Sequence, residues 1–343
     1  MLNTDTYPHI INKLHALYEP HGLALFQRHG ATYPLTVRYT NLEVPPDSVL
    51  SPHPPSELWT RDDLPIYDDE LVPRYKAEGR RLFNGVTFAL DRFNDNVDGH
   101  SVRLHAKLGR YFDFISSSLA MEQEFLQGDL HPMRDRLHTQ VPPADVWRTG
   151  AGRSAALGAG VLTVFKHPDG NYRLIVIQRS AQTADKPGAY HVAPAFIFQP
   201  TGLEYPSSEW SIERQIKREY LEELFNVTEM EDGGVDPAEV PAAQELETML
   251  DSGQASLHFT GFSMNMITTQ VSFCALLLIH QPGWFQEHMG STWEVGNLQV
   301  LPFATDADVL AHLPPDFHIR VTPNGAAALW LGVDRARALL RTG

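Results

Sequence analysis

The sequence predicts a protein of the α+β class built from two parts, with a boundary between residues 145 and 153. The chain has 343 residues, which is about twice the length of a typical single domain. Residues 141–154 combine proline, glycine and serine, a composition typical of a linker. On both sides of this segment, stretches with a strand pattern and stretches with helical spacing follow one another. We therefore expect an N-terminal α+β domain over 1–145 and a second domain over 153–343.

The N-terminal part begins with a predicted helix. Apolar residues in the stretch 7–27 have roughly helical spacing, which is broken at Pro20. Residues 45–73 are rich in proline and acidic side chains and predict a long surface loop. Two strands and a helix are predicted after the loop, over residues 82–91, 101–108 and 111–125.

The second part opens with a β-hairpin. Residues 157–166 and 172–179 are apolar strands, and the turn between them ends in Asp-Gly. A third strand, 189–199, is interrupted by Pro194. The remaining predicted elements are a helix at 210–226, strands at 257–264, 270–280 and 296–303, and helices at 306–313 and from 322 onwards.

The charge of the chain limits its partners. There are 27 Lys and Arg residues against 42 Asp and Glu residues, which gives a formal net charge of -15. An acidic surface repels nucleic-acid phosphates, so we expect no duplex nucleic acid as a partner. A small phosphorylated substrate stays open, because a bound divalent cation reverses the local sign of the charge.

Composition also favours a cytoplasmic protein. The single cysteine, Cys274, cannot form an intramolecular disulfide, which fits a reducing compartment. We expect no signal peptide in residues 1–25, which have no long apolar core. The longest apolar run, 273–279, is too short to span a bilayer and predicts a buried strand. We therefore expect no membrane partner, while a homodimer stays open.

Three glutamates share one face of the helix predicted at 210–226. Glu219, Glu222 and Glu223 stand at positions i, i+3 and i+4, so their carboxylates lie on the same side. These like charges repel one another, and a hard cation that takes oxygen ligands would stabilise them. Oxygen ligands without His or Cys favour Mg²⁺ or Mn²⁺ over Zn²⁺. Taken alone, the helix favours a solvated, glutamate-rich surface over a metal site.

The sequence around these glutamates resembles the Nudix family. The family's box reads Gly-x5-Glu-x7-Arg-Glu-U-x-Glu-Glu-x-Gly-U, where U is apolar, and its Arg-Glu-x-x-Glu-Glu part is matched by residues 218–223. The resemblance implies an α/β/α sandwich with a mixed sheet over 153–343. It also implies an enzyme that hydrolyses acid anhydrides: with Mg²⁺ or Mn²⁺, it would cleave the pyrophosphate bond of a nucleoside-diphosphate derivative such as ADP-ribose and release a nucleoside monophosphate.

The box departs from the family pattern before and after the matched residues. Trp210 occupies the position of the family's glutamate, and the nearest glutamate is Glu209. Gly202 is likewise displaced from the position of the family's first glycine, so the loop is longer by two residues than in the family pattern. Phe225 stands in the second glycine position. These departures favour an alternative, a non-catalytic nucleotide sensor in which the N-terminal domain relays ligand binding. A partner-binding protein with an inactive site is a third hypothesis.

The resemblance implies roles for individual residues. The metal ligands would be Glu219, Glu222 and Glu223. The catalytic residues would be Arg218, Glu222, Glu223 and, as the general base from a later loop, Glu294, with Glu287 as second candidate. Arg218 would also hold the loop by pairing with Glu209, for which a planar guanidinium is well suited.

Aromatic residues near this helix are candidates for contacts with a base. The candidate substrate-binding residues are Tyr190, Phe196, Trp210 and, beside them, Glu209. Because alternate residues of a strand face opposite sides, we expect only one or two of the aromatic rings to line a pocket. The others would pack in the core.

Overall fold

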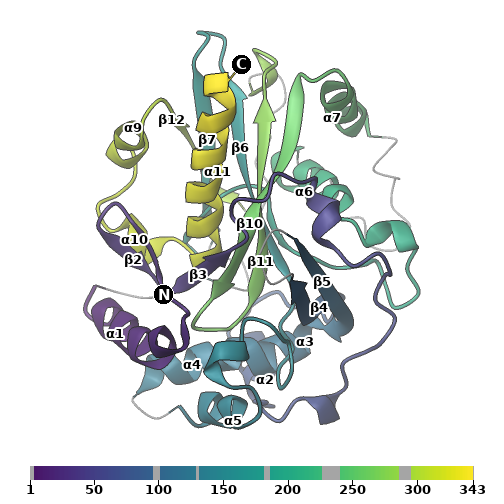
Figure 1. The fold of residues 1–343 in the computed structure, drawn as a ribbon, viewed down its shortest axis with the longest axis vertical. Coiled ribbons are helices and arrows are strands. Elements are labelled where there is room, and N and C mark those ends of the chain that lie inside the picture. The colour runs from purple at the N-terminus through teal and green to yellow at the C-terminus, as the bar shows by residue number, and fades with distance from the viewer. Residues whose placement is uncertain are drawn as a thin grey trace.

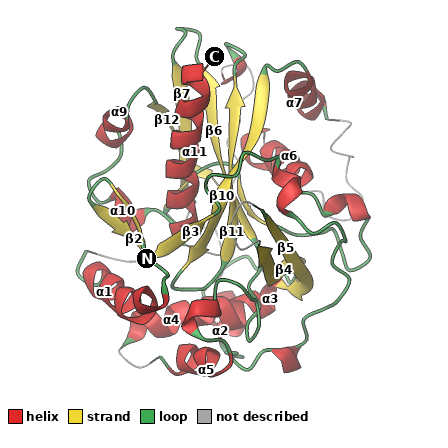
Figure 2. Ribbon diagram, viewed as in Figure 1, coloured by secondary structure: helices red, strands yellow, loops and turns green. Residues whose placement is uncertain are grey.

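A mixed sheet of eight strands forms the centre of the protein (Figures 1 and 2). The computed structural model describes residues 4–95, 101–128, 131–180, 186–225, 240–285 and 295–342. Six strands follow one another in the order β12-β7-β6-β11-β10-β3, and β8 and β9 pair with β7 and β6. Their bounds are β3 Leu35–Arg38, β6 Gly158–Lys166, β7 Tyr172–Arg179, β8 Tyr190–His191, β9 Ala195–Ile197, β10 Ala255–Asn265, β11 Val271–Ile279 and β12 Val295–Pro302. The pair β6 and β11 is parallel and the other pairs are antiparallel, as expected for a mixed sheet.

Helices cover both faces of this sheet. The long helix α11 (Pro323–Thr342) lies over β6, β10 and β11 on one face, where Trp330 is fully buried (Figure 1). Helices α6 (Ile212–Phe225) and α7 (Pro241–Asp251) pack on the other face. Strand β11 shows the division: Cys274 and Leu276 belong to the core under α11, and Phe273 and Ala275 belong to the core that contains α6. The α/β/α layering expected for the second part is therefore present.

The N-terminal region adds small elements around the sheet. They are α1 Tyr7–Tyr18, the hairpin β1 Phe26–Arg28 and β2 Ala31–Tyr33, α2 Leu71–Ala77, and the hairpin β4 Val86–Asp95 and β5 Val102–Arg110. A helix then runs from α3 Tyr111–Phe114 through a π-helical turn, Ile115–Leu119, into α4 Ala120–Gln127, and α5 Pro132–Gln140 follows. Near the C-terminus lie α9 Asp306–Ala311 and α10 Phe317–Arg320.

Residues 45–73 differ from the predicted surface loop. Leu64 and Ile66 are fully buried, and α2 begins at Leu71. The segment also lies along the β4–β5 hairpin, where the Ser51 amide donates to the Leu104 carbonyl at 2.8 Å. The prolines set its turns, but its apolar side chains pack into the core.

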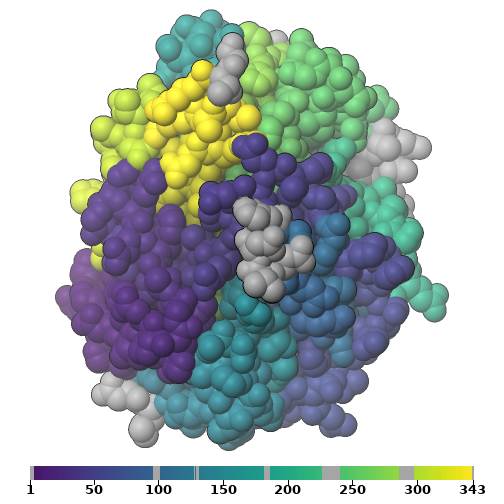
Figure 3. All heavy atoms as spheres, viewed as in Figure 1, coloured from purple at the N-terminus to yellow at the C-terminus, as the bar shows by residue number. Residues whose placement is uncertain are grey.

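Residues 141–154 also differ from the predicted linker. Trp147 and Arg153 are buried, and the Phe88 amide of β4 donates to the Phe198 carbonyl at 3.0 Å. Strand β3 pairs with β10 at the edge of the central sheet, so a strand from the first 145 residues completes a sheet formed by the second part. The space-filling view shows N-terminal residues packed against the C-terminal helix on one face (Figure 3). The two regions therefore share one sheet, and buried residues of both belong to the hydrophobic cluster that contains α6.

Among the residues that the structure describes, no helix combines the length and the apolar character needed to cross a membrane.

Candidate active site

The N-terminus of α6 is closed by hydrogen bonds to every amide of its first turn. Asp47 Oδ1 accepts from the amides of Ile212 and Glu213 at 2.6 and 3.1 Å. Ser211 Oγ accepts from the Arg214 amide at 3.0 Å and donates to Asp47 Oδ2 at 2.6 Å. These amides have no partner within the helix itself, so the two side chains supply what the first turn lacks.

Two further contacts hold the segment before α6 against residues 45–55. Trp210 Nε1 donates to the Ser51 carbonyl at 2.9 Å, and the Tyr205 hydroxyl donates to the Pro55 carbonyl at 2.6 Å. Together with Asp47, they form what we call the α6 clamp, in which a segment of the N-terminal region positions the start of the helix. No local sequence pattern predicts this clamp, because its partners are 150 to 166 positions apart.

One face of α6 is docked on the sheet by apolar side chains. Ile216 and Leu224 are buried, as their helical spacing predicts. Tyr220, in the first apolar position of the box, is fully buried and its hydroxyl accepts from Trp284 Nε1 at 2.8 Å. Burial raises the pKa of Tyr220, so the phenol stays protonated. This docking fixes the rotation of the helix about its axis, and with it the direction of the glutamates.

The three predicted glutamates lie together on α6 with Arg218 among them. The Arg218 guanidinium donates to Glu219 Oε1 at 2.8 Å, and its Nε lies 3.7 Å from Glu222 Oε1. The side chains of Glu219 and Glu222 are 10% and 15% exposed, so these ion pairs are largely shielded from water. An ion pair in such surroundings is stronger than on an open surface.

The environment of Arg218 keeps it charged. Burial lowers the pKa of Arg218, but the negative charges of Glu219, Glu222 and Glu209 outweigh burial and leave the pKa above its usual value. The charge of Glu209 raises the pKa of Arg218 without a direct ion pair between the two side chains. We expected a direct pair between Arg218 and Glu209, whereas the ion pairs of Arg218 are with Glu219 and Glu222.

Glu209 instead closes the loop that precedes α6. Its carboxylate accepts from the Thr201 amide at 2.7 Å and from the Thr201 hydroxyl at 2.9 Å. Glu209 is buried in this position. The longer loop is therefore held by its own side chains, with Glu209 as the internal acceptor.

Glu223 connects α6 to the sheet. Its Oε1 accepts from the Ala195 amide of β9 at 3.0 Å, directly after the cis peptide bond between Ala193 and Pro194. Phe196, the next residue, is half-buried and is the predicted aromatic residue that the structure places beside this contact. Glu223 thus lies on the side of the helix that faces strand β9.

The other two predicted aromatic residues are packed in the core. Tyr190 belongs to the cluster under α11, on the opposite face of the sheet from α6, where its ring centroid lies 5.5 Å from that of Phe317. Trp210 stacks on Phe198 with ring centroids 5.3 Å apart and is 7% exposed. Of the aromatic candidates, Phe196 is therefore the one that directly follows the Glu223 contact in the chain and is only half-buried.

The three glutamates match a divalent cation in the type of their ligand atoms. Glu219, Glu222 and Glu223 offer the carboxylate oxygens that Mg²⁺ and Mn²⁺ prefer, and they lie on one helix. Over the described ranges, however, no three acidic, His or Cys side chains are gathered closely enough to hold a metal ion. The donor set therefore fits a divalent cation in type, while Arg218 and the Ala195 amide now contact its carboxylates. Glu294 and Glu287, the candidates for a general base, lie outside the described residues.

Comparisons with known proteins found partial matches with low TM-scores among solved structures. They include RenU, a Nudix hydrolase from M. smegmatis (14% identity, TM-score 0.29, covering 55% of this chain and 87% of that chain). The NUDIX domain of Shewanella oneidensis NrtR, solved with ADP ribose, matches at 14% identity with a TM-score of 0.31, over 54% of this chain and 90% of that chain. A C. elegans Ap4A hydrolase matches at 14% identity with a TM-score of 0.28, over 54% and 99%. A likeness this distant assigns neither a family nor a substrate. No protein-family model and no curated protein matches the sequence.

Proposed function

We propose that the chain is a Mg²⁺-dependent pyrophosphohydrolase that cleaves a nucleoside-diphosphate derivative and releases a nucleoside monophosphate. The observation that carries the proposal is the set Glu219, Glu222 and Glu223, three largely buried carboxylates on one docked helix. Burial of three carboxylates costs free energy, because each loses its hydration, unless cations or hydrogen-bond donors compensate for it. Their order with Arg218 is the order of the Nudix box.

The residues of the site would have different roles. Glu219, Glu222 and Glu223 would hold the divalent cation, which when bound polarises a phosphoryl oxygen and lowers the pKa of a bound water. Arg218 orients Glu219 and Glu222, and Glu223 is held toward strand β9 by the Ala195 amide. Phe196 would provide an apolar surface beside the site.

The direct test is product release by the full chain. Purified protein is incubated with ADP-ribose and a panel of nucleoside-diphosphate derivatives, with Mg²⁺ or Mn²⁺, and nucleoside monophosphate is followed by chromatography. Activity should be lost in the double variant Glu222→Gln, Glu223→Gln and retained in the control Glu247→Gln, which changes an exposed acid paired with Lys217 on the neighbouring helix. Product release that is unaffected by the double variant would rule out this site.

A nucleotide sensor is the second candidate, and one contact favours it. Arg218 already neutralises part of the charge of Glu219 and Glu222, as a site without a metal requires. In that case the protein would bind ADP-ribose in calorimetry, with the same affinity with and without Mg²⁺, and would release no monophosphate. Heat of binding that requires Mg²⁺, together with turnover, would exclude the sensor.

A further inference from the structure

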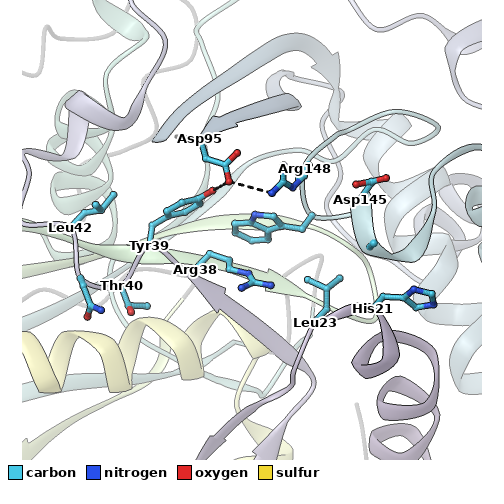
Figure 4. Close-up of a pocket in the computed structure, with 12 residues that line it drawn as sticks. His21, Leu23, Arg38, Tyr39, Thr40, Leu42, Asp95, Asp145 and Arg148 are labelled. Atoms are coloured by element: carbon cyan, nitrogen blue, oxygen red, sulfur yellow. Dashed lines mark hydrogen bonds and ion pairs between the residues drawn. The ribbon is translucent and has the colours of Figure 1, made fainter. Parts of the chain in front are cut away.

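A cavity lies away from α6, in the region that the Nudix resemblance does not cover. It has a volume of about 700 Å³ and is lined by four segments of the first 150 residues, none of which belongs to α6 (Figure 4). They are the end of the α1 region with His21, the end of β3 with Arg38 and Tyr39, the end of β4 with Asp95, and the segment that contains Arg148. This volume is in the range of pockets that bind small organic molecules.

One wall of this cavity is held by a fixed hydrogen-bonded group. The Tyr39 hydroxyl donates to Asp95 Oδ2 at 2.7 Å, and an Arg148 nitrogen lies 3.6 Å from the same oxygen. Tyr39 has a φ of 56°, in the left-handed region that a large side chain rarely adopts. The strained backbone turns the chain at the end of β3 and places the Tyr39 ring against Asp95 (Figure 4).

Arg38 supplies a positive charge that the protein leaves accessible. Its guanidinium is exposed and donates to the Gly22 carbonyl at 2.9 Å. Over the described part of the chain, no carboxylate lies within 4.0 Å of Arg38. In a protein with a net charge of -15, such an accessible cation offers an anion a local positive charge on an acidic chain.

Asp145 is the complementary group on the lining. Its carboxylate has no cationic partner among the residues that the structure describes, and in the view of Figure 4 it is drawn beyond Arg148, away from Tyr39. The apolar part of the lining comes from Leu23, Leu42 and Trp147. The cavity therefore offers a cation, a hydrogen-bond acceptor and an apolar surface to one small molecule.

We propose that this cavity binds an organic anion with a ring body and a hydrogen-bond donor, in the size range of a nucleoside monophosphate. The anionic group contacts Arg38, with Arg148 close by, the ring packs on the apolar lining, and a hydroxyl or amino group donates to Asp145. Phosphate and carboxylate heads both meet this description, since a guanidinium binds either one through two parallel hydrogen bonds. The site is independent of the α6 glutamates and of any divalent cation.

Calorimetry with the full chain in EDTA tests the proposal, using AMP, 4-hydroxybenzoate, adenosine and inorganic phosphate as probes. We expect AMP or 4-hydroxybenzoate to bind, with the stronger of the two identifying the head group, and adenosine and inorganic phosphate to bind much more weakly. Arg38→Gln should weaken binding by roughly tenfold or more, because a charge-assisted hydrogen bond is lost. The matched control Arg74→Gln, which removes an exposed arginine from α2, should leave affinity unchanged.

Two outcomes would overturn the site. The first is absence of binding by both AMP and 4-hydroxybenzoate at millimolar concentration. The second is wild-type affinity in Arg38→Gln, whose folding is checked by its thermal unfolding midpoint. Binding is also measured in the Glu222→Gln, Glu223→Gln variant: retained affinity supports a site separate from α6, and lost affinity places the ligand at α6 and refutes the proposal. These binding measurements do not depend on whether the protein hydrolyses a nucleotide.

Discussion

Substitution of Asp47 by alanine tests whether the N-terminal region holds α6 in place. The change removes the acceptor for the Ile212 and Glu213 amides and the partner of the Ser211 hydroxyl. Loss of an N-terminal cap costs about 1 kcal/mol, and a hydrogen bond to a charged acceptor contributes about 1.5–3 kcal/mol. The favourable position of a carboxylate at a helix N-terminus adds about 0.5 kcal/mol.

One interaction acts in the opposite direction. Burial raises the pKa of Glu213, and the charge of Asp47 raises it further, so removal of Asp47 relieves some repulsion. We therefore expect Asp47→Ala to lower the free energy of unfolding by about 2–3 kcal/mol. Asp47→Asn keeps one acceptor oxygen and should lose about half as much.

Urea unfolding followed by circular dichroism measures this loss, and amide hydrogen exchange locates it. Exchange in a peptide that covers residues 211–216 should accelerate by roughly thirtyfold in Asp47→Ala, since about 2 kcal/mol corresponds to that factor. Asp62→Ala, which removes an exposed acid from the same region, is the control. A variant within about 0.5 kcal/mol of the wild type, with unchanged exchange at the start of α6, would refute the reasoning.

Three further changes probe other parts of the molecule. Arg134→Ala should lower the free energy of unfolding, measured in urea titrations, by about 2–4 kcal/mol. Buried Arg134 donates to the carbonyls of Met266 and Ile267, and these acceptors would lose their partner. A loss below about 1 kcal/mol would contradict this. His138→Gln should flatten the pH dependence of stability. Burial, with nearby arginines, lowers the pKa of His138 in the folded state, so below the unfolded value of about 6.5 the unfolded chain takes up a proton that the folded chain does not, and stability falls as pH decreases. Thermal midpoints between pH 7.5 and 5 measure the slope, and an equal slope in the variant would exclude His138 as a contributor. Glu223→Gln should weaken Mg²⁺ binding in calorimetry by roughly tenfold or more if the carboxylate is a metal ligand; an unchanged titration would remove it from the ligand set.

Local patterns in the sequence predicted much of the second part. The hairpin of β6 and β7 is marked by apolar strands and an Asp-Gly turn, and both strands lie within one residue of their predicted bounds. Helix α6 is marked by Ile212, Ile216 and Leu224, whose spacing is typical of the buried face of a helix, and all three are buried. In these elements, the signal is contained in a few consecutive residues.

The remaining features depend on contacts between distant segments. Strand β3 has four residues, too few for a strand periodicity, and pairs with β10, which lies more than 200 positions later. The sequence does not distinguish whether the Trp210 ring lines a pocket or stacks on Phe198, because an aromatic residue is suited to both roles. Asp47, which completes the α6 clamp, is in a proline-rich segment whose composition is typical of an exposed loop.

The pairing of β3 with β10 has a consequence for any attempt to divide the protein. A fragment that begins at residue 153 would lack β3, so the backbone groups of β10 that pair with Leu35–Arg38 would be exposed. An unpaired strand edge is a template for another chain, and the apolar faces now covered by α1 and the β4–β5 hairpin would lie beside it. We expect such a fragment to aggregate on expression. The motif at residues 218–223 therefore lies inside a larger folding unit, and a fragment for expression should include the N-terminal region.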